Sequence, residues 1–235
     1  MAVTAANLTT VAGGVQATSY TTASTSPGAN KLELLWVYSI AATAPNIPTI
    51  TWNSATWAQI DTQLDSSGLR RITLFRSLTA SPSSGTGTIG FAGQTQQGAC
   101  WSYVEYTGID TSGTNGSGAI VQSAKNASAG NATSLTVTLA AFGSASNATA
   151  GGFGIPLNTA SQPTVGSGFT ATGQANQGST NTSIGSEFNA GNDTTVDMTS
   201  GAASIPWVGI AVEIKVASST VTPGARITYV PPFMS

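Results

Sequence analysis

Acidic side chains are the first candidates for chemistry in this sequence. It contains nine Asp and Glu residues and no His. Glu33, Glu105 and Glu213 each lie inside an apolar run that predicts a β-strand, and Glu105 has Tyr103 and Tyr106 as neighbours. Two carboxyl groups facing each other across a sugar-binding groove could hydrolyse a glycosidic bond.

A structural role for the same three glutamates is the alternative, and we favour it. Outward-facing carboxylates on strands are commonly paired with basic side chains, and this chain offers Arg70, Arg71 and Lys215 as partners. A fold supplies no activity unless a specific site is built on it. We therefore predict no catalytic residues and expect the protein not to be an enzyme.

The absence of His narrows the remaining chemistry. A Ser-His-Asp triad, a zinc site with His ligands and a His general base are all excluded. Cys100 is the single cysteine, so no internal disulfide can form, and it lies in the strand-like segment "ACWSYVEY". We expect it to behave as a small buried apolar residue.

Two acidic loops could in principle bind calcium. The segments "DTSGTNG" (110–116) and "GNDTTVD" (191–197) offer the oxygen ligands that Ca²⁺ takes. Neither has the spacing of an EF-hand loop, and both are typical of turns in which an Asp side chain accepts a backbone hydrogen bond. We therefore predict no metal and no cofactor.

The tryptophans could form a platform on which sugar rings stack. Trp36 and Trp207 have apolar neighbours within strands, so we expect them in the core. Trp52 and Trp57 flank a short turn-like segment and are the better candidates for glycan contact, although packing is favoured for them too.

The elements that would position these residues are almost all β-strands. Segment 31–40, "KLELLWVYSI", has apolar residues on both faces, so we expect it to be covered on both sides. We interpret "PTITWN" and "TWAQIDTQ" as a hairpin turning at Asn53-Ser54, and the glycine-rich "GTGTIGFAG" as an edge or bulged strand. Helical periodicity is missing, and no clear internal repeat is visible. These features predict an all-β fold, a single antiparallel β-sandwich of roughly ten to twelve strands.

Composition limits the partners. Charged residues make up 7% of the chain, and the net charge is −2, so no electrostatic attraction to nucleic acid is expected. No apolar run is long enough to span a membrane as a helix. The surface rich in Ser, Thr, Asn and Gly is typical of proteins that work outside cells, yet a secretory signal and disulfides are both lacking. A protein that assembles in the host cytoplasm and leaves by lysis, as virion components do, satisfies both observations.

The order of the strand-like segments resembles a known family. "KLELLWVYSI" is followed by "ITWNSATWAQI", "RITLFRSL", "SYVEYTGID", "SLTVTLAAF" and "WVGIAVEIK". Over roughly residues 18–215 this series resembles the jelly-roll-like β-sandwich domains of phage virion structural proteins, and of some bacterial surface proteins. The resemblance implies a capsid decoration or tail accessory protein that binds other virion proteins and forms a homo-oligomer. It brings no catalytic residue with it.

The two ends of the chain are predicted to be arms outside the sandwich domain of residues 18–215. We expect an N-terminal arm over residues 1–17 and a C-terminal interaction arm over residues 216–235. Prolines would hold the C-terminal segment extended, and its apolar side chains would anchor on a neighbouring subunit. The expected subunit contacts are Ile227, Tyr229, Val230, Pro231, Pro232 and Phe233. The alternatives are a tail folded back on its own sandwich and, for the whole protein, a carbohydrate-binding or adhesin-type module.

Overall fold

The computed structural model describes residues 2–14, 16–157, 163–201 and 205–218. Within these ranges the protein is built from antiparallel strands, and one short 3-10 helix, η1 (Ser117–Ala119), is the only helical element. The all-β prediction is therefore confirmed, and so is the packing of antiparallel sheets into a β-sandwich.

Sixteen strands, more than the ten to twelve expected, divide evenly on either side of η1. The first eight are β1 (Thr4–Gly13), β2 (Ser19–Thr21), β3 (Leu32–Ala41), β4 (Thr49–Thr51), β5 (Ala58–Leu64), β6 (Arg70–Ser77), β7 (Thr88–Gly90) and β8 (Gln96–Thr107). The second eight are β9 (Ile120–Ala127), β10 (Ser134–Thr138), β11 (Ala148–Ile155), β12 (Thr164–Val165), β13 (Thr170–Gln177), β14 (Thr182–Asn189), β15 (Thr195–Thr199) and β16 (Val208–Ile214).

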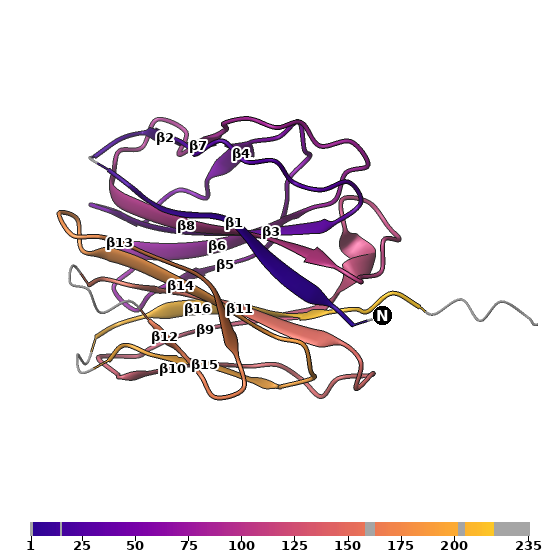
Figure 1. Ribbon diagram of the computed structural model, residues 1–235. Coiled ribbons are helices and arrows are strands. Elements are labelled where there is room, and N and C mark those ends of the chain that lie inside the picture. The colour runs from indigo at the N-terminus through magenta and orange to yellow at the C-terminus, as the bar shows by residue number, and fades with distance from the viewer. Residues whose placement is uncertain (1, 15, 158–162, 202–204, 219–235) are drawn as a thin grey trace, which may run out of the picture.

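The strands form four sheets that stack as layers (Figure 1). The two inner layers are five-stranded, with the orders β1-β8-β3-β6-β5 and β13-β14-β11-β16-β9. Each inner sheet carries a three-stranded sheet on its outer face, β2-β7-β4 on the first and β10-β15-β12 on the second. Every strand pairing is antiparallel.

The strand order is the same in the two halves of the chain. Adding eight to each strand number of the first half converts β1-β8-β3-β6-β5 into β9-β16-β11-β14-β13, which is the second inner sheet. The same operation converts β2-β7-β4 into β10-β15-β12. The chain is therefore a tandem repeat of one eight-stranded unit, although the sequence shows no clear repeat.

Three apolar clusters fill the three spaces between the layers. The central cluster joins the two inner sheets and includes Trp36, Tyr38 and Ile210. Clusters around Trp101 and Phe153 fill the spaces beneath the two outer sheets. Every residue of β3 is buried, because this strand lies in the middle of an inner sheet that is covered on both faces. The two-sided burial expected for this segment is confirmed.

Two local expectations are wrong, for the same reason. Asn53 and Ser54 do form a turn, both with positive φ, but β4 and β5 on either side belong to different sheets and do not pair. The glycine-rich β7 is the central strand of its sheet, between β2 and β4. Gly87, immediately before β7, allows close approach of β4, since a Cβ on Gly87 would lie 2.4 Å from the carbonyl oxygen of Thr51. Short-range signals show that a strand exists but not which strands become its neighbours.

The N-terminal residues also differ from the expected arm. Thr4–Gly13 is β1, an edge strand that pairs with β8 along its whole length, with one irregularity between Asn7 and Thr9. Its partly buried Val11 packs against the Trp101 cluster. At the other end, Val216 forms an isolated bridge with Ile109, and residues 219–235 lie outside the described residues.

Candidate functional site

The first buried carboxylate is that of Glu105, near the end of β8. Glu105 is 7% exposed, and its two oxygens accept hydrogen bonds from different groups. Lys31 Nζ, immediately before β3, lies 2.5 Å from Oε1, and the backbone nitrogen of Gly28 donates to Oε2 at 2.9 Å. The charge of this nearly buried carboxylate is therefore compensated by an ammonium group and a backbone donor.

Glu33 lies directly opposite Glu105 in the β3–β8 register and is fully buried. The Tyr103 hydroxyl donates to its Oε2, and that hydroxyl accepts a hydrogen bond from Asn53 Nδ2 at 3.1 Å. Burial raises the pKa of Glu33 to about 7, which the nearby Glu105 carboxyl reinforces. The second oxygen, Oε1, has no partner in the structure. This chain of polar groups connects the inner sheet to the Asn53 turn.

Glu213 occupies the corresponding place in the second half. Its position on β16 matches that of Glu105 on β8, because Glu213 lies opposite Thr149, the second residue of β11, as Glu105 lies opposite Glu33, the second residue of β3. Its Oε1 accepts from Asn147 Nδ2 at 2.5 Å, and its Oε2 accepts from Gln122 Nε2 at 2.6 Å.

The donors to the two glutamates are equivalent as well. Lys31 is the residue immediately before β3, and Asn147 is the residue immediately before β11, the matching strand. Each donates to the glutamate of its own half. The repeat therefore preserves a buried carboxylate held by the residue that precedes the central strand, with an ammonium donor in one half and an amide donor in the other.

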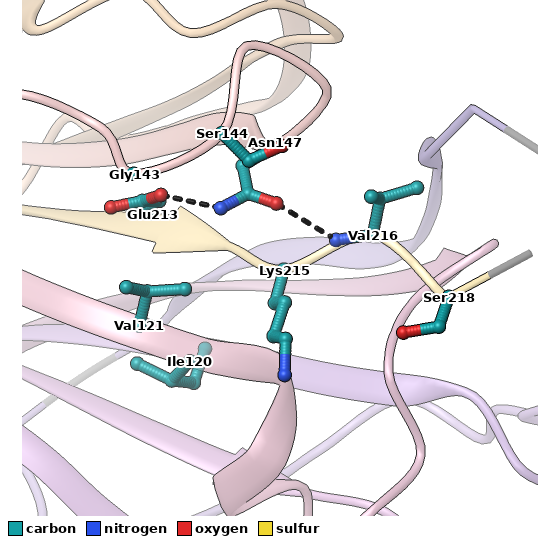
Figure 2. A pocket seen from close by; sticks show the side chains of 9 residues that line it. All are labelled: Ile120, Val121, Gly143, Ser144, Asn147, Glu213, Lys215, Val216 and Ser218. Atoms are coloured by element: carbon teal, nitrogen blue, oxygen red, sulfur yellow. Dashed lines mark hydrogen bonds between the residues drawn. The ribbon is translucent and has the colours of Figure 1, made fainter.

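A surface pocket of about 530 Å³ lies beside Glu213 (Figure 2). Asn147 connects its two sides, since its amide donates to Glu213 and its Oδ1 accepts from the backbone nitrogen of Val216 at 3.2 Å. The Lys215 side chain extends away from Glu213 in Figure 2, and its ammonium group pairs with Asp110 at 2.7 Å. The remaining lining residues are Ile120, Val121, Gly143, Ser144 and Ser218.

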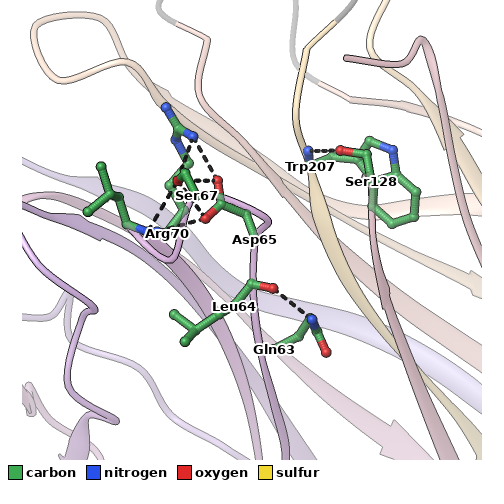
Figure 3. A network of polar contacts seen from close by, with 8 residues as sticks. Gln63, Leu64, Asp65, Ser67, Arg70, Ser128 and Trp207 are labelled. Atoms are coloured by element: carbon green, nitrogen blue, oxygen red, sulfur yellow. Dashed lines mark hydrogen bonds and ion pairs between the residues drawn. The ribbon is translucent and has the colours of Figure 1, made fainter. Parts of the chain in front are cut away.

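The expectation that the three strand glutamates face outward is wrong, because all three are buried. The basic residues that were expected to pair with them have other partners. Arg70 lies 2.7 Å from Asp65, in the turn between β5 and β6 (Figure 3). Arg71 donates to the carbonyl oxygen of Pro45 at 2.6 Å.

The glutamates do not face one another across a groove. Glu33 and Glu105 are neighbours in one sheet, but they lie under the first outer layer, and neither lines the pocket. Glu213 borders the pocket with both oxygens accepting hydrogen bonds from side-chain amides. In this geometry the carboxylates bind strands and loops to one another.

The two acidic loops form the turns expected from their sequences. Asp110 Oδ1 accepts from the backbone nitrogen of Ser112 at 2.8 Å, and Asp193 Oδ1 accepts from that of Thr195 at 2.9 Å. Hydrogen bonding to Lys215 and Ser112 lowers the pKa of Asp110 to about 2. Among the described residues, no group of three or more acidic, His or Cys side chains is arranged to hold a metal ion.

The tryptophans and the cysteine lie mainly in the interior. Trp36 and Trp207 are buried, as predicted. Trp52 is 3% exposed, and its indole nitrogen donates to the carbonyl oxygen of Gly85 at 3.2 Å, whereas Trp57 is only half-buried. Cys100 is fully buried, and burial raises the pKa of its thiol to about 12. This thiol is thus a packing group, as the sequence indicated.

The predicted subunit-contact residues, Ile227, Tyr229, Val230, Pro231, Pro232 and Phe233, lie outside the described residues. Residues that sequence reasoning overlooked are Lys31, Asn147 and Gln122, the donors to the buried glutamates. One signal could have pointed to them. "YVEY" (103–106) and "AVEI" (211–214) place a glutamate at matching points of two apolar strands, and such a glutamate needs a donor when it is buried.

Comparisons of the chain with protein-family models, with curated proteins and with solved structures find no match. The part of the chain that the structure describes contains no helix long and apolar enough to cross a membrane.

Proposed function

We propose that this protein is a non-enzymatic structural component of a virion, a capsid decoration (cement) or tail accessory protein that binds neighbouring subunits. One observation carries the proposal: the buried strand carboxylates are used to hold the fold. Glu105 is held by Lys31 and a backbone donor, and Glu213 by two amides. A hydrolase would present such carboxylates to its substrate. In this protein they instead connect loops to strands.

The four-layer stack suits a protein whose task is adhesion. Three apolar clusters and the polar contacts between layers make a rigid body. Little conformational entropy would therefore be lost when its surface binds a neighbouring subunit. The charge-poor surface adds little desolvation cost on contact with another protein. Both properties support a role in assembly with other virion proteins and with copies of itself.

The C-terminal segment supplies the arm in this proposal. The described chain ends at Ser218, on the wall of the surface pocket, and the apolar residues from Ile227 to Phe233 follow. A chain of the length of residues 219–235 spans at most roughly 55–60 Å when extended, which is enough to reach an adjacent subunit. The segment "ARITYV" could add a strand to a neighbouring sheet edge.

The test compares the full chain with a variant lacking residues 219–235. This deletion leaves the hydrogen bond from the Ala217 backbone nitrogen to Gly108 in place. We expect the full chain to form oligomers in sedimentation analysis and to occupy native particles in electron microscopy. The truncated protein should keep its melting temperature and lose both properties.

Two results would count against the proposal. Full occupancy by the truncated protein would show that the arm is not needed. A monomeric full-length protein that binds a glycan array, and loses this binding in Trp57→Ala, would instead identify a carbohydrate-binding module. A glycan array, a sedimentation run and particle images therefore separate the two functions.

A further inference from the structure

The two halves of the chain meet through matching faces of their inner sheets. Strand β3 of the first half lies across from β11, its own equivalent in the second half. Leu34 pairs with the last residue but one of β6, and Ala150 pairs with the last residue but one of β14, so the two residues are equivalent. Counting on along β3 and β11, Trp36 is equivalent to Gly152, and Tyr38 is equivalent to Gly154. The face of each unit therefore contacts the equivalent face of the other.

At these positions a large side chain of one half lies on a glycine of the other. A Cβ on Gly152 would lie 2.4 Å from the Trp36 ring, and a Cβ on Gly154 would lie 2.2 Å from the Tyr38 ring. Both rings are fully buried, so neither can move away without disturbing its surroundings. The indole nitrogen of Trp36 also donates to the carbonyl oxygen of Ile210 at 3.3 Å.

Polar contacts between residues of opposite halves flank this apolar centre. Ser102 and Ser186 share a hydrogen bond of 2.7 Å within the interface. At one edge Asn7 Nδ2 donates to the carbonyl oxygen of Thr172, and at the other Lys125 Nζ lies 2.7 Å from Asp61 Oδ1. These hydrogen bonds and the Lys125–Asp61 ion pair thus help to set the register of the two sheets.

We propose that the chain is an intramolecular heterodimer, in which the inner-sheet face of each half is an interaction surface specific for the other half. Neither face fits a second copy of itself. Two Trp36-bearing faces would place two indole rings in space that holds one, and two Gly152-bearing faces would leave a cavity. The two equivalent faces therefore fit in one combination, the first half against the second.

The covalent connection between the halves is then not needed to hold them together. This connection runs from Gly108 to η1, and residues 111–114 are exposed. An exposed loop of this kind tolerates insertion and cleavage. The test inserts a site for a specific protease between Gly113 and Thr114 of the full chain and cleaves it after folding.

We expect the two fragments to elute together in size-exclusion chromatography and to unfold in a single transition within a few degrees of the uncut protein. Fragments that separate, or that precipitate, under native conditions would overturn the proposal. The covalent link would then be the main element that holds the halves together.

Specificity is tested by Gly152→Ala and Gly154→Ala in the cleavable chain. Each should lower the midpoint of thermal unfolding by roughly 5 °C and promote separation of the fragments after cleavage. Gly130→Ala is the matched control, because a Cβ there would meet no atom within 4 Å. Equal midpoints for Gly152→Ala and the control, with the fragments still joined, would show that the large-on-glycine contacts do not determine the interface.

Discussion

At the scale of single residues, the fold depends on buried carboxylates whose oxygens find donors. Glu213 illustrates this, because it is fully buried and both of its oxygens accept hydrogen bonds from amide groups. Removing one donor from a buried carboxylate lowers the free energy of unfolding by more than the net contribution of an ordinary hydrogen bond. The reason is that the carboxylate stays desolvated after its donor is lost. Asn147 is the more sensitive donor because it also accepts from Val216.

We therefore predict that Asn147→Leu lowers the free energy of unfolding by about 2–3 kcal/mol. Asn126→Leu is a suitable control, because the Asn126 side chain is exposed and bonds only to the carbonyl oxygen of Thr136 and to the neighbouring backbone of Ala127. Urea denaturation of both variants measures the difference. A loss no larger than that of the control would show that Gln122 or water replaces the missing donor.

At the scale of elements, the turn between β5 and β6 shows how a local polar network fixes a strand pair. Asp65 is 5% exposed and accepts from the Ser67 hydroxyl, from the Arg70 backbone nitrogen and from the Arg70 guanidinium (Figure 3). Gly68 closes the turn with φ of 71°, a conformation in which a side chain is strained. The network brings Leu64 and Arg71 into register.

Asp65→Ala should destabilise the protein by about 2 kcal/mol, since it removes several hydrogen bonds, one of them to a charged partner. Ser66→Ala, on an exposed neighbour in the same turn, should change the stability by less than about 0.5 kcal/mol. Hydrogen exchange should show faster exchange along β5 and β6 in the Asp65 variant. Unchanged exchange in these strands would mean that sheet pairing alone sets the register.

At the scale of the whole molecule, each half carries a buried glutamate whose pKa is raised, Glu33 in the first half and Glu187 in the second. Burial raises the pKa of Glu33 to about 7 and that of Glu187 to about 8. In the unfolded chain both groups return to ordinary values near 4.5. Between these limits the folded state holds more protons than the unfolded state, so its stability falls as the pH rises.

We predict that the protein is more stable at pH 5 than at pH 8, with a decline of up to about 1.4 kcal/mol per pH unit for each group inside its window. Asp110 acts in the opposite sense. Its lowered pKa stabilises the fold above pH 4, and this contribution is lost as the pH falls toward 2. Urea denaturation from pH 3 to pH 9 records the profile.

The variant Glu33→Gln/Glu187→Gln should flatten this profile above pH 5, because neither amide ionises. Greater stability than the unaltered protein at pH 8 is expected, with little difference at pH 5. A profile as steep as before would assign the pH dependence to other groups.

The sequence by itself determined the class of the fold. Alternating apolar residues and missing helical periodicity predict strands, and the turns at Asn53-Ser54 and at Asp110 are where local chemistry places them. Burial of Trp36, Trp207 and Cys100 followed from their apolar neighbours. These features depend on a few adjacent residues, so they can be derived from the order of residues alone.

Only the tertiary structure decided which strands are neighbours. The separation of β4 from β5, the central place of β7 and the pairing of Glu213 with Asn147 join residues that nothing local connects. The repeat of two eight-stranded units is hidden in the sequence, because equivalent positions such as Trp36 and Gly152 hold complementary and not similar residues. Close packing between the halves constrains the combined volume of two facing side chains. The sequence of one segment does not show which residue that segment will face.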